Sequence, residues 1–166
     1  DPEKIEISTI ETLLDGINAS IATHILVGGS KVDNIDTEQI VSEIKKHTLL
    51  PVVLFPGDVS QLTPRADGLL FLSLISGRNP DYLIGQHVKA VRQLNGHDME
   101  IIPTGYILIE NGKQTSVEKV TGTKPLQRND LDTITDTAKA GELLGMKLIY
   151  LEAGSGAHEA VATKII

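Results

Sequence analysis

Residues 147–157 read Lys147-Leu148-Ile149-Tyr150-Leu151-Glu152-Ala153-Gly154-Ser155-Gly156-Ala157, and they contain the most informative pattern in the chain. An apolar run stops at the carboxylate of Glu152 and passes directly into a Gly-Ser-Gly turn. Glycines at the end of a strand let bare backbone N–H groups approach an anion closely. A hydroxyl stands beside them, and the carboxylate remains to bind polyol hydroxyls. The segment therefore predicts a strand that ends in a binding turn for a small phosphorylated polyol.

Four other apolar runs resemble the one that precedes Glu152. They are continuous rather than alternating, as expected for strands that are buried on both faces of a parallel sheet. These runs are His24–Gly29, Leu50–Phe55, Gly68–Ser73 and Glu100–Thr104. Together with Leu148–Leu151 they make five predicted strands.

Between the predicted strands the apolar period changes to that of a helix. Ser8-Thr9-Ile10-Glu11 resembles a capping box, and it precedes a helical face that begins at Ile10. Asp36 is predicted to cap a second helix, Asn79-Pro80 to begin a third, and Asn129 or Asp130 to begin a fourth that ends near Gly145. The polar segment 111–127 is predicted to be a long loop. Strands and helices thus alternate as a βα repeat.

Repeated βα units form either an open doubly wound sheet or a closed (βα)8 TIM barrel. We expect the barrel, because polar and glycine-rich residues follow nearly every predicted strand, where a barrel builds its active site. These strand-end segments are residues 28–30, 56–58, 73–79, 104–106 and 152–155. Five strands cannot close an eight-stranded barrel, so residues 1–166 are expected to be a single partial TIM-barrel domain, with the first strand and the last strands missing.

Composition excludes several classes of function. The chain has 15 basic and 22 acidic side chains and a net charge of −7, which argues against a sequence-independent grip on nucleic acid. It contains no cysteine, so it has neither a disulfide framework nor a thiolate metal site. No apolar run reaches the length of a membrane span and no signal-peptide pattern opens the chain. We therefore expect a cytoplasmic protein without stable membrane insertion.

Several longer blocks carry a resemblance to a known family. In chain order they are Asp1–Lys4, His24–Ser30, Phe71–Gly85, Pro103–Leu108, Thr123–Leu126 and Gly145–Ala157. This series resembles the geranylgeranylglyceryl phosphate synthase family, which includes the bacterial heptaprenylglyceryl phosphate synthases. The full Gly-Ser-Gly form of the last block is similar to the second of the family's two main groups.

The resemblance implies a Mg²⁺-dependent TIM-barrel prenyltransferase. Such an enzyme joins a polyprenyl diphosphate, most often geranylgeranyl diphosphate, to the C3 hydroxyl of sn-glycerol 1-phosphate. It forms an ether-lipid precursor and releases diphosphate. Mg²⁺ neutralises the leaving group, a rigid cradle holds the glycerol phosphate, and an apolar groove takes the prenyl tail. Relatives assemble as dimers or hexamers, so the resemblance also implies a homo-oligomer.

Site residues follow from the same resemblance. Asp1 and Ser30 match the two positions associated with magnesium. Glu152 is expected to bind the glycerol hydroxyls and to accept the proton, and Tyr150 to position the glycerol or the developing charge. The segment that matches the glycerol-phosphate loop comprises Tyr150, Leu151, Glu152, Ala153, Gly154, Ser155 and Gly156.

Structural interpretations and rival functions remain open at this point. Asp1 can also be explained as a solvated chain start, Ser30 as a strand-end turn or cap residue, and Glu152 as a strand-end charge satisfied by a neighbouring lysine. The rival functions are a TIM-barrel phosphosugar isomerase or aldolase-like enzyme and a non-catalytic phosphate-binding barrel. The family completes its phosphate cradle with turns after its last two strands, which residues 1–166 do not supply. We therefore expect the intact protein to be active and this segment alone to be inactive.

Overall fold

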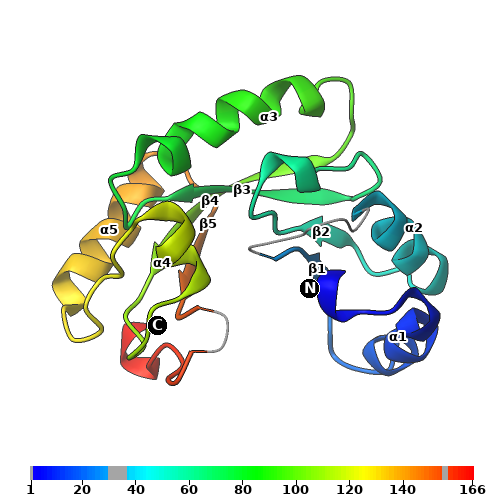
Figure 1. Cartoon of the computed structure of the whole chain (residues 1–166), viewed down its shortest axis with the longest axis horizontal. Coiled ribbons are helices and arrows are strands. Elements are labelled where there is room, and N and C mark those ends of the chain that lie inside the picture. The colour runs from blue at the N-terminus through cyan, green and yellow to red at the C-terminus, as the bar shows by residue number, and fades with distance from the viewer. Residues whose placement is uncertain (1, 30–36, 155–156) are drawn as a thin grey trace. The chain divides into compact units, whose positions relative to one another are not determined.

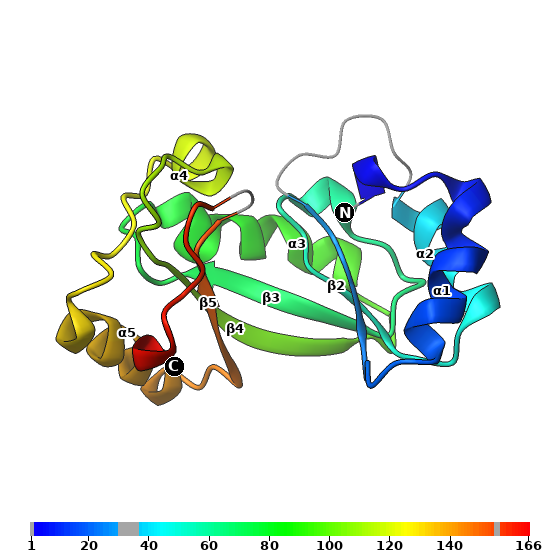
Figure 2. The same ribbon diagram turned by 90° about the horizontal axis from the view of Figure 1, so that it is seen from below.

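The computed structural model describes residues 2–29, 37–154 and 157–166 (Figures 1 and 2). The predicted magnesium residues Asp1 and Ser30 lie outside these ranges, as do the predicted helix cap Asp36 and the turn residues Ser155 and Gly156. Within the described ranges, no helix combines the length and the apolar character that a membrane-spanning helix requires.

Five strands form one sheet, in the hydrogen-bonded order β1-β2-β3-β4-β5. They are β1 (Ile25–Val27), β2 (Val52–Leu54), β3 (Gly68–Leu74), β4 (Glu100–Leu108) and β5 (Leu148–Glu152). The registers of β1 with β2, of β2 with β3 and of β4 with β5 are all parallel. The predicted strands and the parallel α/β class are therefore confirmed, whereas closure into an eight-stranded barrel and the single partial domain stay predictions.

The first helix precedes β1 in the chain, and the other helices lie between strands. They are α1 (Ile10–Asn18), α2 (Thr37–His47), α3 (Gln86–Leu94), α4 (Ser116–Thr121) and α5 (Leu131–Leu143). Shorter helical turns occur at η1 (Pro2–Lys4), η2 (Ile7–Thr9), η3 (Val59–Gln61), η4 (Asp81–Gly85) and η5 (Thr163–Ile165). η4 is a π-helical turn that runs directly into α3.

The chain divides into two compact units, and the boundary passes through β3, α3 and β4. The first unit comprises Asp1–Leu70 and Lys89–Ile101, and the second comprises Phe71–Val88 and Ile102–Ile166. In the first unit α1 lies beside α2 (Figures 1 and 2), and the Asn18 side chain donates to the carbonyl oxygen of His47 over 2.8 Å. The buried residues of this unit include Ile10, Leu14, Ile40, Val41, Ile44, Val52 and Leu54.

The second unit has a core where α5 packs on β4 and β5 (Figure 1). Its fully buried members are Ile107, Ile109 and Ile134. Gly105 in β4 and Gly141 in α5 make this packing possible. A Cβ on either glycine would lie 2.9 Å or less from the Ile149 or Ile75 side chain. Small residues at both positions therefore let the helix and the strand approach closely.

Three local predictions need correction. The predicted capping box requires Ser8 as the N-cap of α1, but α1 begins at Ile10, so its N-cap is Thr9, which makes no side-chain capping bond. β4 continues to Leu108, so Thr104-Gly105-Tyr106 lies within the strand and not after it. Segment 111–127 contains α4, which begins where the Thr115 hydroxyl accepts from the Glu118 N–H.

Candidate functional site

The end of β5 places two predicted site residues on one face of the sheet. Side chains of a strand alternate between faces, so Tyr150 and Glu152 point to the same side and Leu151 points to the other. Leu151 packs against the core of the second unit, which leaves only its backbone for a ligand. In the register with β4, Tyr150 lies opposite Tyr106 and Glu152 lies opposite Leu108.

Two tyrosines stack beside the carboxylate. The rings of Tyr106 and Tyr150 are nearly parallel, with an interplanar angle of 14° and centroids 5.7 Å apart. Burial raises the pKa of the Tyr106 phenol, and the nearby Glu152 carboxylate raises it further. The pKa of Tyr150 is raised by the same two causes and by a hydrogen bond with Glu152. Both phenols therefore stay protonated at neutral pH, and Tyr150 serves as a neutral hydrogen-bond donor to the carboxylate.

The turn after β5 folds back on its own strand. The Glu152 carboxylate accepts a hydrogen bond from the backbone N–H of Gly154 over 2.5 Å. Gly154 is buried and has a φ of +100°, a conformation that favours glycine. The structure thus brings together Tyr150, Glu152, Ala153 and Gly154, which the sequence predicts to be site residues. The half-buried carboxylate, a phenol and a tight glycine turn suit the binding of a polar, hydroxylated ligand.

The residues that hold this arrangement come from β4 and from the segment that follows it. Tyr106, Asn111 and Thr115 are all buried. The sequence places Tyr106 in the strand-end segment 104–106, but it assigns none of the three a role in binding or catalysis. The register of β4 with β5 identifies Tyr106, but this register depends on tertiary pairing between distant segments. Asn111 and Thr115 stand in a polar stretch that reads as a loop, and only their side-chain contacts show what they do.

A second strand end, in the first unit, is also closely packed. Gly28 follows β1, and a Cβ there would lie 2.5 Å from the Phe55 carbonyl carbon and closer still to its oxygen. The buried side chain of Gln61 donates to the carbonyl oxygen of Gly29 over 3.0 Å and accepts from the N–H of Gly57 over 3.0 Å. Gln61 thereby joins the segments that follow β1 and β2.

Replacing Gln61 by leucine is expected to destabilise the protein by about 2 kcal/mol, because the Gly29 carbonyl and the Gly57 N–H lose their partner. Urea unfolding measures the difference in free energy. Gln127→Leu is the matched control, since Gln127 is exposed, and its effect is expected to stay within about 0.5 kcal/mol. An unchanged unfolding free energy for Gln61→Leu would show that these two bonds do not stabilise the fold.

The described residues do not identify a metal centre. Across residues 2–29, 37–154 and 157–166, no group of three or more histidine or carboxylate side chains is arranged to hold an ion. Asp1 and Ser30 lie outside these residues. Magnesium binding by this pair therefore stays a prediction that rests on the resemblance.

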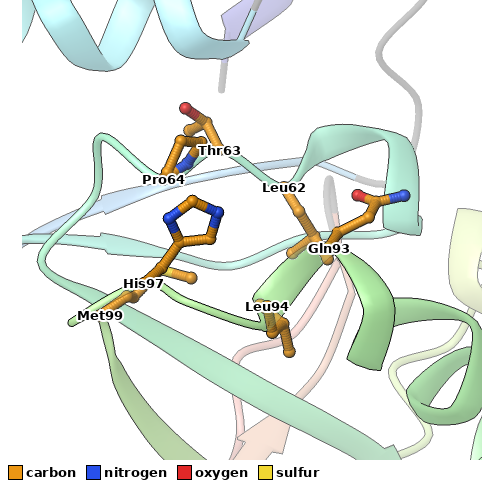
Figure 3. Close-up of a pocket in the computed structure, with 7 residues that line it drawn as sticks. All are labelled: Leu62, Thr63, Pro64, Gln93, Leu94, His97 and Met99. Carbon is orange, nitrogen blue, oxygen red and sulfur yellow. The ribbon is translucent and has the colours of Figure 1, made fainter.

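A pocket lies in the first unit, next to the amino ends of β3 and β4 (Figure 3). Its walls come from the segment before β3, from the end of α3 and from the segment before β4. The lining residues are Leu62, Thr63, Pro64, Gln93, Leu94, His97 and Met99. Of the predicted site residues that the structure describes, none lines this pocket. Active sites of parallel α/β folds lie at the carboxyl ends of the strands, so this pocket is not the candidate site.

Comparison with known proteins gives the family. The model of the PcrB family matches residues 1–166. The chain belongs to the PcrB family. Among PcrB relatives, geranylgeranylglyceryl phosphate synthase of Flavobacterium johnsoniae is 54% identical over 166 residues, which are 100% of this chain and 68% of the relative. The enzyme of the same name from Korarchaeum cryptofilum is 34% identical over 166 residues, which are again 100% of this chain and 68% of the relative. The predicted family resemblance is confirmed, and membership of its second group stays a prediction.

Solved structures of PcrB relatives have the same fold. (S)-3-O-geranylgeranylglyceryl phosphate synthase from Thermoplasma acidophilum, in complex with its substrate sn-glycerol 1-phosphate, matches with a TM-score of 0.90 and 30% identity. The match covers 99% of this chain and 66% of that chain. The wild-type enzyme from Thermoplasma volcanium matches with the same TM-score and 32% identity. The chain thus spans about two thirds of the length of the relatives it matches.

Proposed function

We propose that the protein is a prenyltransferase that joins a polyprenyl diphosphate, with geranylgeranyl diphosphate as the first choice, to the C3 hydroxyl of sn-glycerol 1-phosphate. The observation that carries the proposal is the Glu152–Gly154 turn beside Tyr150. It occurs in a chain that is 54% identical to a geranylgeranylglyceryl phosphate synthase. A relative whose fold matches with a TM-score of 0.90 binds sn-glycerol 1-phosphate.

In the proposed reaction, the C3 hydroxyl oxygen of the glycerol forms a bond to C1 of the prenyl group while the bond between C1 and the diphosphate oxygen breaks. Diphosphate leaves with the electron pair of that bond, and Glu152 accepts the hydroxyl proton. Tyr150 donates to the carboxylate and keeps it oriented. Tyr106 stacks on Tyr150 and holds its ring in place. The ether product, diphosphate and one proton account for all atoms of the substrates.

Magnesium is part of the proposal. Carboxylate and hydroxyl oxygens are ligands that Mg²⁺ accepts, so Asp1 and Ser30 are chemically suited to hold it together with diphosphate and water. When bound, the ion neutralises charge on the leaving diphosphate.

The test is an assay of the full gene product with labelled geranylgeranyl diphosphate and sn-glycerol 1-phosphate, with Mg²⁺ or with a chelator. We expect a labelled ether product that forms with Mg²⁺ and is lost with the chelator. sn-Glycerol 3-phosphate is the matched control, since it differs only in configuration, and it is expected to react poorly. Absence of ether product under all conditions would refute the proposed function.

The rival isomerase or aldolase-like reading has less support. An aldolase of the Schiff-base type needs a lysine at the carboxyl end of a strand. Lys147 immediately precedes β5 and its N–H donates to the Pro103 carbonyl oxygen, so it stands at the amino end of the strand, away from Glu152. The same assay separates the readings, because an isomerase or aldolase consumes no prenyl diphosphate.

Assembly and location belong to the proposal as well. The family resemblance supports a homo-oligomer, which sedimentation of the purified protein would detect. A cytoplasmic location without stable membrane insertion fits the sequence.

A further inference from the structure

Asn111 is a buried polar residue that the proposed chemistry does not use. It follows β4 by three positions, and only 1% of its surface is exposed. Its side-chain N–H group donates to the carbonyl oxygen of Ala153, and its side-chain oxygen accepts from the N–H of Lys113 over 3.3 Å. Both ends of the amide are therefore satisfied, and one of them holds the turn that follows β5. Burying an amide is costly unless its bonds are made, so this arrangement is specific.

Thr115 makes a second contact with the same turn. It is 2% exposed, and its hydroxyl is fixed because it accepts from the Glu118 N–H over 3.2 Å at the start of α4. Its methyl group lies against Gly154, so closely that a Cβ on Gly154 would collide with the Thr115 side chain. The turn therefore fits against a rigid surface that α4 holds in place.

Ile109 provides a third contact. Its N–H donates to the backbone carbonyl oxygen of Glu152 over 2.8 Å. The segment after β4 thus contacts three consecutive residues of the turn: Ile109 bonds Glu152, Asn111 bonds Ala153, and Thr115 packs on Gly154. The bond from Ile109 continues the β4–β5 ladder and does not depend on Asn111. Asn111 therefore controls the turn beyond the strand, and the ladder holds the backbone of Glu152.

We propose that Asn111 is a positioning residue for the glycerol-phosphate turn, which it fixes in shape before the substrate arrives. The inference rests on the proposed function. The phosphate of glycerol phosphate takes no part in bond making or breaking, so the turn binds it equally in the ground state and in the transition state. Loss of such uniform binding raises KM and leaves kcat unchanged. Loss of the Asn111 amide is therefore expected to raise KM for glycerol phosphate, whereas loss of the Glu152 carboxylate is expected to lower kcat.

The test is Asn111→Asp, which keeps the size of the side chain, removes the donor and places a carboxylate oxygen against the Ala153 carbonyl oxygen. We expect KM for sn-glycerol 1-phosphate to rise about 10-fold or more, as for loss of a buried hydrogen bond. We expect kcat and the KM for prenyl diphosphate to stay within about threefold of the wild-type values. Asn18→Asp is the matched control, since Asn18 also donates to a backbone carbonyl, that of His47, over 2.8 Å, and its kinetics are expected to equal those of the wild type.

Thr115→Ser is the second variant, for the case that Asn111→Asp does not fold. It removes the methyl group that faces Gly154 and keeps the hydroxyl that caps α4, so a smaller rise in the same KM is expected. An unchanged KM for glycerol phosphate in both variants would overturn the inference. So would a fall in kcat that matches the rise in KM, because this pattern indicates general damage to the fold.

A binding measurement separates failure of this inference from failure of the proposed function. sn-Glycerol 1-phosphate is expected to raise the melting temperature of the wild type, and to raise that of Asn111→Asp much less at the same concentration. Wild-type protein that binds glycerol phosphate and forms no ether would refute the proposed reaction and leave the role of Asn111 intact. Equal shifts in the two proteins would refute the role of Asn111 and leave the reaction intact.

Discussion

Replacing Glu152 by glutamine is expected to lower kcat for ether formation by about 10²- to 10⁴-fold, the usual contribution of a positioned general base. Glutamine has the same shape, and its carbonyl oxygen can still accept from the Gly154 N–H, which the carboxylate does in the native turn. It cannot take the proton of the C3 hydroxyl. The fold and the turn should therefore persist while the chemical step fails. Initial rates at saturating substrates measure the effect.

The chain offers a matched control one strand away. Glu110 follows β4, and its carboxylate accepts from the Gly112 N–H over 2.5 Å, the same local arrangement as in Glu152 and Gly154. Glu110→Gln therefore makes the same chemical change in the same kind of turn. Its kcat is expected to stay within a few-fold of the wild-type value. Equal losses in the two variants would show that Glu152 has no special part in proton transfer.

Replacing Gly28 by alanine is expected to have the largest effect on stability, about 3 kcal/mol or more. The new Cβ would overlap the Phe55 carbonyl, and backbone cannot turn aside as a flexible side chain can. The Phe55 N–H also donates to the Val27 carbonyl oxygen over 2.7 Å. Relief of the overlap would therefore pull β1 and β2 apart where they are hydrogen-bonded. Urea unfolding of both proteins gives the difference.

Gly16→Ala is the control for that experiment. Gly16 lies in α1, and nothing stands within 4 Å of the Cβ position. Alanine in an open helical position lowers the entropy of the unfolded chain, so this variant is expected to be about 0.5–1 kcal/mol more stable than the wild type. A similar stability of Gly28→Ala and the wild type would contradict the close approach of Gly28 and Phe55.

Much of the secondary structure could be predicted from local pattern. The continuous apolar runs identify all five strands. The burial on both faces that such runs predict is seen in β2, whose three residues are all buried, whereas β1 and β5 are partly exposed. The cap at Asp130, whose carboxylate accepts from the Thr133 N–H over 3.1 Å, and Gly145, with a φ of +88°, mark the two ends of the α5 region. These signals are strong because each one depends only on near neighbours in the chain.

The wrong predictions concern features that depend on contacts between residues distant in the sequence, or on exactly where an element begins. β4 continues through Tyr106 to Leu108 because residues 104–108 pair with β5, which lies about 40 positions later in the chain. The sequence Ser8-Thr9-Ile10-Glu11 matches a capping box, but Ser8 lies inside the turn η2 and Thr9 takes the N-cap position of α1. Asn111 stands among polar residues in the sequence, but its side chain is buried in the structure. Its importance follows from pairing with a residue 42 positions away.

The candidate site, like the fold, could be predicted from the sequence only in part. Its centre, Glu152 with the glycine turn, could be read directly from the end of an apolar run, and family membership strengthens that reading. Its supports could not, because Tyr106, Asn111 and Thr115 act through contacts with residues that are distant in sequence. A glycine turn thus reveals where a ligand is expected, whereas the buried partners behind it reveal how its shape is kept.

The three contacts from the segment after β4 also restrict how that segment can change in evolution. Surface connections usually tolerate insertions and deletions. Here, Ile109, Asn111 and Thr115 must meet three adjacent residues of one turn. One extra residue between Ile109 and Thr115 would carry an anchor out of reach. The length of this connection is therefore expected to be invariant, while its exposed positions, such as Lys113 and Gln114, are free to vary in identity.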